Sequence, residues 1–179
     1  MRKLFILGTL IFFSVAMLMT ACMKDETNYM GENRGNNNGG DGTDAEYVDL
    51  GLPSGTKWKT ANETGGFNDY YTFYEALIAY GKNLPTKEQL KELKDNCTWE
   101  WQNNGSYKVT GTNGNSIVLP AAGNRSCEGD INSVGKHGFY WSCSARTPDR
   151  AWSLDFNSDG VYIDYYTRCD GQSVRLVQY

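Results

Sequence analysis

Histidine is almost missing from this chain of 179 residues, in which His137 is the only one. Zinc-protease sites and the facial triad of non-haem iron enzymes need several imidazole ligands, so this shortage excludes both kinds of metal site. The sequence also lacks the Gly-Lys-Ser/Thr ending of a phosphate-binding loop. His137 itself stands in a glycine-flanked segment, residues 135–138, that is typical of a surface turn.

Basic residues are also in short supply. Lys and Arg together number 17 against 21 Asp and Glu, which gives a net charge of −4. Because nucleic-acid-binding proteins usually carry a basic surface, we expect no nucleic-acid partner. The chain is 40% hydrophobic and 13% aromatic, which is enough for a packed core. This composition excludes a coiled coil, a collagen-like chain and a wholly disordered chain.

Residues 1–21 have the pattern of a secretory signal peptide: Arg2 and Lys3, an apolar run that is too short to span a membrane, and small residues before Cys22. The sequence Met-Thr-Ala-Cys at 19–22 resembles the lipobox of bacterial lipoproteins, in which the peptidase cuts before the cysteine and the thiol is acylated. The resemblance implies that Cys22 is lipidated. Cleavage would leave 15 cations and 21 acids, a net charge of −6, so only the lipid should contact the membrane.

Residues 22–45 are rich in Gly and Asn and show no apolar periodicity, which predicts a flexible linker. Lys24, Asp25 and Glu26 resemble the surface-export signal of Bacteroidota lipoproteins. We therefore expect a protein that is lipid-anchored to the outer membrane and displayed on the cell surface. The periplasmic leaflet is the alternative.

Residues 46–179 have the length of one domain. A Pro/Gly turn between two extended runs predicts a hairpin over 47–60. A stripe of apolar residues predicts a helix over 72–80, and Thr86 with Gln89 forms a capping-box pattern that begins a second helix and runs to Asn96. Alternation and turn residues predict the later strands at 98–101, 107–110, 116–119, 139–142, 152–156, 161–166 and 173–177. The pattern indicates an α+β domain.

Six motifs in this domain, in the same order, resemble the Fibrobacter succinogenes major paralogous domain: residues 47–58, 84–88, 96–101, 119–123, 140–142 and 171–175. That family is similar to the formylglycine-generating-enzyme branch of the C-type lectin fold. The resemblance implies a C-type-lectin-like domain with two helices, antiparallel strands and long loops. Some relatives are targets of diversity-generating retroelements and display a diversified face near the C-terminus. The Glu-Pro-Asn motif of calcium-dependent lectins is missing, which puts sugar binding of that type in doubt.

Four cysteines follow Cys22, and an oxidising compartment favours disulfides among them. Four cysteines allow three pairings. The lectin-like resemblance implies Cys143–Cys169, with Cys97 as a buried free thiol and Cys127 unpaired. Formylglycine-generating relatives use reactive cysteines with copper, but we find no cysteine pair at an active-site spacing, so we expect neither a cofactor nor an enzyme.

Residues 155–160 match the first half of an EF-hand loop, but position twelve is Tyr166 where calcium binding needs Glu. A tight turn between two strands explains this segment without a metal, so we expect no metal site.

Alternation along 161–166 predicts a core side with Val161, Ile163 and Tyr165, joined by Trp152, Leu154 and Phe156. The other side exposes two tyrosines and an acid close to the arginines of the neighbouring loops. Tyrosine and arginine supply large contact areas at low entropic cost. The expected ligand-binding residues are Arg146, Arg150, Tyr162, Asp164, Tyr166, Arg168 and Asp170.

We therefore predict a non-catalytic surface lipoprotein that binds a protein or a glycan through the C-terminal loops and strands. Two alternatives stay open: a formylglycine-generating-like oxidase, and a structural subunit of a cell-surface assembly.

Overall fold

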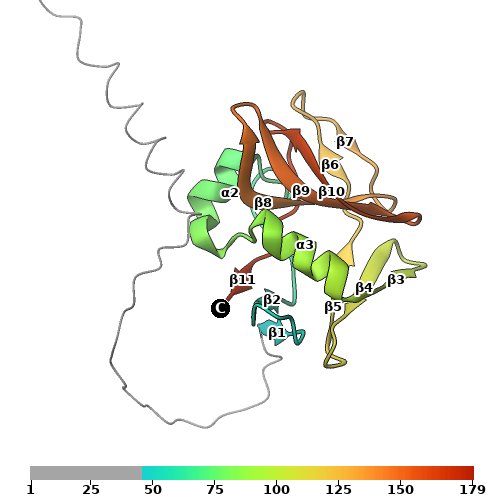
Figure 1. The fold of residues 1–179 in the computed structure, drawn as a ribbon. Coiled ribbons are helices and arrows are strands. Elements are labelled where there is room, and N and C mark those ends of the chain that lie inside the picture. Colours follow the sequence, from blue (N-terminus) through green and yellow to red (C-terminus); the bar gives the residue numbers. More distant parts are fainter. Residues whose placement is uncertain (1–45) are drawn as a thin grey trace, which may run out of the picture.

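A computed structural model describes residues 46–179, which form a mixed α+β fold (Figure 1). The predicted signal peptide, the Cys22 lipidation site and the linker at 22–45 lie outside the described residues. Within the described part, no helix is long and apolar enough to cross a membrane.

The described elements follow one another as short strands, two helices and then a long run of strands. The helices are α2 (Phe73–Tyr80), the 3-10 helix η2 (Gly81–Asn83) and α3 (Lys87–Asn96). The strands are β1 (Tyr47–Asp49), β2 (Lys57–Lys59), β3 (Thr98–Gln102), β4 (Ser106–Thr110), β5 (Ser116–Pro120), β6 (Asn124–Arg125), β7 (Ile131–Asn132), β8 (Gly138–Thr147), β9 (Arg150–Asn157), β10 (Gly160–Thr167) and β11 (Val177–Gln178).

Both α-helices begin at a capping box. The Oγ1 of Thr86 accepts from the Gln89 N–H at 3.1 Å, and the Gln89 side chain accepts from the Thr86 N–H at 2.9 Å. Thr72 and Glu75 make the same exchange in front of α2. The capping box predicted for α3 is confirmed, and the reciprocal bonds explain why the helix starts at Lys87.

The strands form four small antiparallel sheets, in the orders β1-β2-β11, β10-β9-β8, β3-β4-β5 and β6-β7. The predicted hairpin over 47–60 is confirmed as β1 and β2. The strand expected over 173–177 is much shorter, because only Val177 and Gln178 pair with β2. Ser173 instead bridges to Tyr140 in the middle of β8.

The β10-β9-β8 sheet is the centre of the fold, with α3 packed against one face and α2 against β8 (Figure 1). Each helix packs into one hydrophobic cluster. The α3 cluster includes Leu90, Leu93, Tyr140, Leu154 and Phe156, and the α2 cluster includes Phe73, Leu77, Trp141, Ala151 and Val174. Consecutive residues of β8, Tyr140 and Trp141, thus belong to different clusters. The first six residues of β8, Gly138 to Cys143, are therefore buried on both sides, which explains the consecutive aromatic residues Phe139, Tyr140 and Trp141.

Gly138 begins β8 where the Phe156 ring crosses it. A Cβ at this glycine would lie 2.1 Å from Cζ of Phe156. Only a residue without a side chain allows this approach, so the glycine is required by packing of the sheet.

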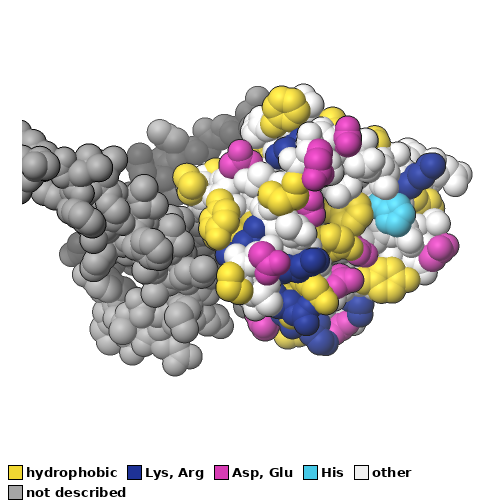
Figure 2. All heavy atoms as spheres, turned by 90° about the horizontal axis from the view of Figure 1, so that it is seen from above, with side chains coloured by type: hydrophobic (Ala, Val, Ile, Leu, Met, Phe, Trp, Pro, Cys, Tyr) yellow, Lys and Arg dark blue, Asp and Glu magenta, His cyan; other side chains and the backbone are white. Residues whose placement is uncertain are grey.

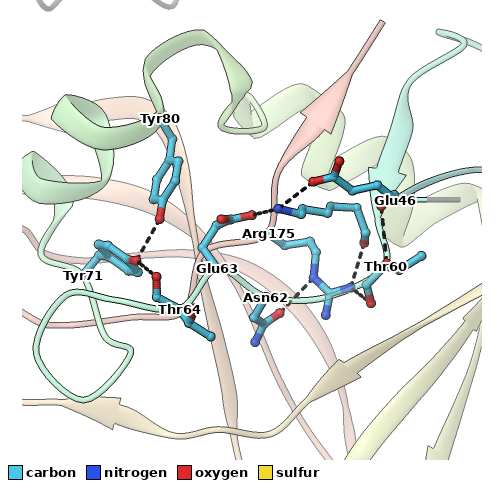
Figure 3. Close-up of polar contacts among 9 residues, drawn as sticks. Glu46, Thr60, Asn62, Glu63, Thr64, Tyr71, Tyr80 and Arg175 are labelled. Carbon is cyan, nitrogen blue, oxygen red and sulfur yellow. Dashed lines mark hydrogen bonds and ion pairs between the residues drawn. The ribbon is translucent and has the colours of Figure 1, made fainter. Parts of the chain in front are cut away.

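Arg175 is 2% exposed and joins three segments of the domain, and Figure 3 shows its bonds to the segment that follows β2. Its guanidinium donates to the carbonyls of Lys59 and Thr60 at 2.8 and 2.7 Å, to the Val118 carbonyl at 2.8 Å, and to Oδ1 of Asn62 at 2.8 Å. These acceptors lie in and after β2 and on β5. The arginine therefore holds the C-terminal segment, the β1-β2 sheet and the β3-β4-β5 sheet together.

A disulfide joins Cys127 to Cys169, with their Cα atoms 5.1 Å apart. The expected Cys143–Cys169 pairing is wrong, as is the expectation that Cys127 is unpaired, because a sulfur forms one disulfide. The bridge ties the segment after β6 to the segment after β10, two regions that backbone hydrogen bonds between Arg125 and Gly171 already hold close together. Cys97 is a free thiol, as predicted.

Candidate functional site

The structure divides the seven expected binding residues into three groups. Tyr162, Asp164, Tyr166 and Asp170 lie on or beside the same face of the β9–β10 hairpin. The guanidinium groups of Arg146 and Arg150 lie near an aromatic ring on the opposite face of this hairpin. Arg168 is buried.

The first group centres on Tyr166, whose hydroxyl donates to Oδ2 of Asp155 across the hairpin. Asp164 and Asp170 are close enough to act on the same phenol electrostatically. Tyr162 pairs with Asp155 in the register of the two strands. We call these five residues, Asp155, Tyr162, Asp164, Tyr166 and Asp170, the Tyr166 surface.

Burial and negative charge dominate the electrostatics of this surface. Burial, reinforced by the bond to Asp155 and by the nearby carboxylates, raises the pKa of Tyr166 far above its ordinary value, so the phenol stays protonated. Burial also raises the pKa of Asp155, which the Tyr166 hydroxyl partly offsets, and it raises the pKa of Asp170. The surface thus carries three carboxyl groups and two phenol hydroxyls, and the hydroxyl of Tyr166 already donates to Asp155.

Phe139 contacts Tyr166 from the side of β8, and His137 stacks behind Phe139. Phe139 meets the Tyr166 ring edge to face, with centroids 5.2 Å apart, and His137 stacks on Phe139 at 5.9 Å. His137 also lowers the pKa of Asp155 electrostatically, although burial outweighs it. The histidine that the sequence placed in a surface turn therefore stands at the margin of the Tyr166 surface.

Tyr162 and Asp164 are the most accessible members. The Tyr162 side chain is 49% exposed. Asp164 is exposed, and its Oδ1 accepts the N–H of Tyr165 at 2.8 Å. By contrast, Tyr166 is half-buried against the α2 cluster, so only part of its ring and its hydroxyl region can meet a partner.

Arg146 and Arg150 belong to a basic–aromatic cluster at the end of the same sheet. The Arg146 guanidinium lies 3.4 Å from the ring centre of Tyr165, and Nζ of Lys87 lies 3.4 Å from that of Trp152. Trp152 and Tyr165 were expected in the core. They are half-buried, because the α3 cluster ends before them and cations cover their rings instead.

Arg168 was expected at the binding face and is only 4% exposed. Its side chain donates to the carbonyls of Arg150 and Thr147 and to the Tyr74 hydroxyl. The guanidinium also lies 4.9 Å from the Phe73 ring centre. These contacts fasten α2 to the β8–β9 turn, so Arg168 is a packing residue and is not available to a ligand.

Among the described residues, one group has the spacing of a metal site: Cys127, Cys169 and Asp170. The two sulfurs are bonded to each other, which leaves a single carboxylate as ligand. The turn at 157–160 closes with the Asn157 side chain, which accepts the N–H groups of Asp159 and Gly160 at 2.8 and 3.2 Å. The tight turn predicted for this segment is present, and the Asn157 amide oxygen serves in it.

Charges of both signs are dispersed over the face of the domain that Figure 2 shows. On the face seen in Figure 2, acidic, basic and hydrophobic side chains are interspersed, and neither sign of charge covers the face alone. A partner at such a surface is recognised by local pairs of groups rather than by a broad electrostatic field.

Residues 82–177 match a family described as a domain of unknown function, DUF8237. The chain belongs to this family. No curated protein and no solved structure matches the chain.

The DUF8237 segment runs from η2 to the first residue of β11 and contains the whole Tyr166 surface and the basic–aromatic cluster. Strands β1 and β2 and helix α2 lie before it. Arg175 belongs to the DUF8237 segment, but Asn62 and the carbonyls of Lys59 and Thr60 do not. The match therefore covers the candidate site but omits part of the scaffold that supports it.

Sequence reasoning missed Asp155, Phe139 and Lys87 as neighbours of the candidate residues. Asp155 was considered only as a calcium ligand. Its place opposite Tyr162 depends on the two-residue turn of the β9–β10 hairpin, and alternation on both strands was the signal that could have found it. Lys87 lies far away in sequence from Trp152, and only the packing of α3 brings them together.

Proposed function

We propose that this protein is a non-catalytic lipoprotein that binds a protein or glycan ligand through the Tyr166 surface. The observation that supports it is that Tyr162, Asp164 and Tyr166 share one face of β10, with Asp164 and Asp170 near the Tyr166 phenol. A half-exposed tyrosine beside several carboxylates can stack on a sugar ring or an apolar side chain and accept hydrogen bonds from hydroxyl or cationic groups.

The proposed site of action is outside the cytoplasm, with the protein anchored to the outer membrane by a lipid on Cys22 and displayed at the cell surface. The Cys127–Cys169 disulfide supports export, since structural disulfides persist in oxidising compartments. Both cysteines are exposed, so a reducing cytosol would have access to them.

The finer family placement is part of the proposal. We place the chain in a C-type-lectin-like domain similar to the Fibrobacter succinogenes major paralogous domain. Its two helices and antiparallel strands support this placement, as does the burial of Arg175 in the motif at residues 171–175. In this placement the Tyr166 surface lies in the C-terminal region that diversified relatives use for binding.

The oxidase alternative has less support. It needs a reactive thiolate, but burial and the Glu92 carboxylate raise the pKa of Cys97 to about 11. Cys127 and Cys169 are consumed by their disulfide. No observation on the described residues favours copper chemistry over binding.

A binding array tests the proposal. The purified full-length protein is applied to immobilised neutral and uronic-acid glycans and to a panel of secreted proteins. We expect selective binding that Tyr162→Ala weakens at least roughly tenfold, because exposed tyrosines in interfaces are frequent hot spots.

Two further variants test the Tyr166 hydroxyl and supply a control for the loss of an exposed tyrosine. Tyr166→Phe removes only the hydroxyl and keeps the packing against Phe139, so a loss of binding in this variant assigns the hydroxyl a role. Tyr179→Ala changes a tyrosine that is 70% exposed at the C-terminus and serves as the matched control. Binding that is equal in the wild type and the Tyr162→Ala variant would remove the Tyr166 surface from consideration.

A further inference from the structure

Strand β10 forms one edge of the β10-β9-β8 sheet, so among the described residues no strand lies beside the other side of its backbone. Asn157 and Gly160 flank a two-residue turn and form a hydrogen-bonded pair, and bonded pairs then alternate along the hairpin. The N–H and C=O groups of Val161, Ile163 and Tyr165 therefore point away from β9. The bond from the Tyr165 N–H to its neighbour's carboxylate agrees with this direction.

The outer edge of β10 stays open among the described residues. The elements that pack substantially against β10 are β9, its hairpin partner, and α3, which also packs against β8 and β9 and so crosses the face of the sheet. No backbone–backbone hydrogen bond joins residues 161–166 to any described segment other than β9.

This edge also lacks the usual protection against pairing. Edge strands are commonly blunted by lysine, proline, a bulge or a very short length. Strand β10 is eight residues long, contains no Lys, Arg or Pro, and pairs with β9 without a register shift. Its one charged residue is Asp164, whose side chain covers a single outward N–H.

We propose that two copies of this chain associate through their β10 strands, antiparallel and centred on Ile163. In this register Ile163 lies opposite itself and Val161 lies opposite Tyr165 of the second copy. These are the outward-pointing residues, so the pairing supplies about six backbone hydrogen bonds once Asp164 releases the Tyr165 N–H in each copy. The two three-stranded sheets become one continuous sheet.

Charge favours the register centred on Ile163 over the register centred on Asp164. A centre at Asp164 would place the two Asp164 carboxylates opposite each other, which is unfavourable. A centre at Ile163 places Asp164 opposite Tyr162 of the second copy, whose hydroxyl can donate to the carboxylate. On the other face of the joined sheet, Ile163 is opposite Ile163 and Val161 is opposite Tyr165, so these pairs are apolar or aromatic. This self-complementarity favours a second copy over an unrelated extended peptide.

The pairing would extend the candidate site. Residues that are opposite each other in a sheet point to the same face, so both Tyr166 surfaces would lie on one side of the joined sheet. Tyr162 and Asp164 of each copy would then adjoin those of the other. The inference concerns assembly and does not depend on the identity of the ligand.

Sedimentation equilibrium of the purified full-length protein in detergent gives the first test. We expect a reversible monomer–dimer equilibrium in the wild type and a monomer after Ile163→Lys, which brings two ammonium groups together at the centre. Circular dichroism checks that the variant is folded, since Ile163 also packs against the α3 cluster.

Cysteine cross-linking tests the register and does not depend on the Ile163→Lys variant. Opposed Cα atoms in a hydrogen-bonded pair are about 5.5 Å apart, within the range of a disulfide. Mild oxidation should therefore cross-link Ile163→Cys with itself. Val161→Cys alone should not cross-link, because the two sites would be roughly 14 Å apart, but a mixture of Val161→Cys and Tyr165→Cys proteins should.

The wild type, oxidised in parallel, controls for Cys97 and the native disulfide. A wild-type protein that stays monomeric at all concentrations would overturn the proposal. Failure of Ile163→Cys to cross-link in a folded protein would overturn it as well. This holds even if an unrelated extended peptide binds the β10 edge.

Discussion

At the scale of single residues, Arg175 shows how a charged side chain can serve as a structural link. Within residues 46–179 no carboxylate lies within bonding distance of it, and its hydrogen bonds there go to three carbonyls and one side-chain amide. Burial lowers its pKa from the ordinary value. A guanidinium suits this position because its planar fork carries several donors in fixed directions.

Replacing Arg175 should destabilise the fold strongly. Arg175→Met leaves buried acceptors without donors, each at a cost of about 1–3 kcal/mol, so we expect a loss of at least about 3 kcal/mol in the free energy of unfolding by urea. Arg175→Lys should recover part of this loss. Arg146→Met, at an exposed site, is the control and should cost less than about 1 kcal/mol. Equal stabilities of the two Met variants would contradict the assignment.

At the scale of elements, the β9–β10 hairpin combines structure and chemistry. The Asp155–Tyr166 bond links its two strands on the face opposite α3. The same burial that supports Tyr166 opposes ionisation of Asp155 and raises its pKa. An acid whose pKa is raised on folding favours the folded state when it is protonated.

The hairpin should therefore respond to pH. Between the ordinary Asp value of 3.8 and the raised pKa of Asp155, the contribution of this residue to stability should fall as the pH rises. Asp155→Asn removes the ionisation, so the stability of the variant relative to the wild type should increase through this window and stay level above it. Urea titrations at several pH values measure the difference.

Tyr166→Phe provides the matching control. Loss of the hydroxyl removes the bond that lowers the pKa of Asp155, so the pH window should extend upward. A wild type and an Asp155→Asn variant that change in parallel with pH would contradict the burial of this carboxyl.

At the scale of the whole molecule, long-range connections hold several small sheets together. The Cys127–Cys169 disulfide closes a loop of 42 residues that contains β7, β8, β9 and β10. Closing a loop of this length restricts the unfolded chain and contributes about 4 kcal/mol in the entropic description.

Removing this disulfide should cost about that amount. Cys127→Ala combined with Cys169→Ala should lower the free energy of unfolding by up to about 4 kcal/mol, measured in urea without reductant. Cys97→Ala is the control, since this thiol is free and only partly buried. A double variant as stable as the wild type would show that the backbone bonds between Arg125 and Gly171 hold these segments without the bridge.

Features that depend on near neighbours could be predicted from the sequence. The Thr86 capping box, the turn at Asn113-Gly114 and the alternation of Val161, Ile163 and Tyr162 all follow from contacts within a few residues. Features that depend on distant partners could not. The burial of Arg168 requires Tyr74, 94 residues away in the chain.

The sequence by itself determined that the domain is α+β, where its helices begin, and which side of β10 carries Tyr162, Asp164 and Tyr166, because hydrogen-bonding and alternation rules are local. Only the tertiary structure decided that Cys169 pairs with Cys127, that Arg146 covers Tyr165, and that β10 is an edge. Each of these depends on which segments far apart in the chain become neighbours, and that choice is made by packing of the whole domain.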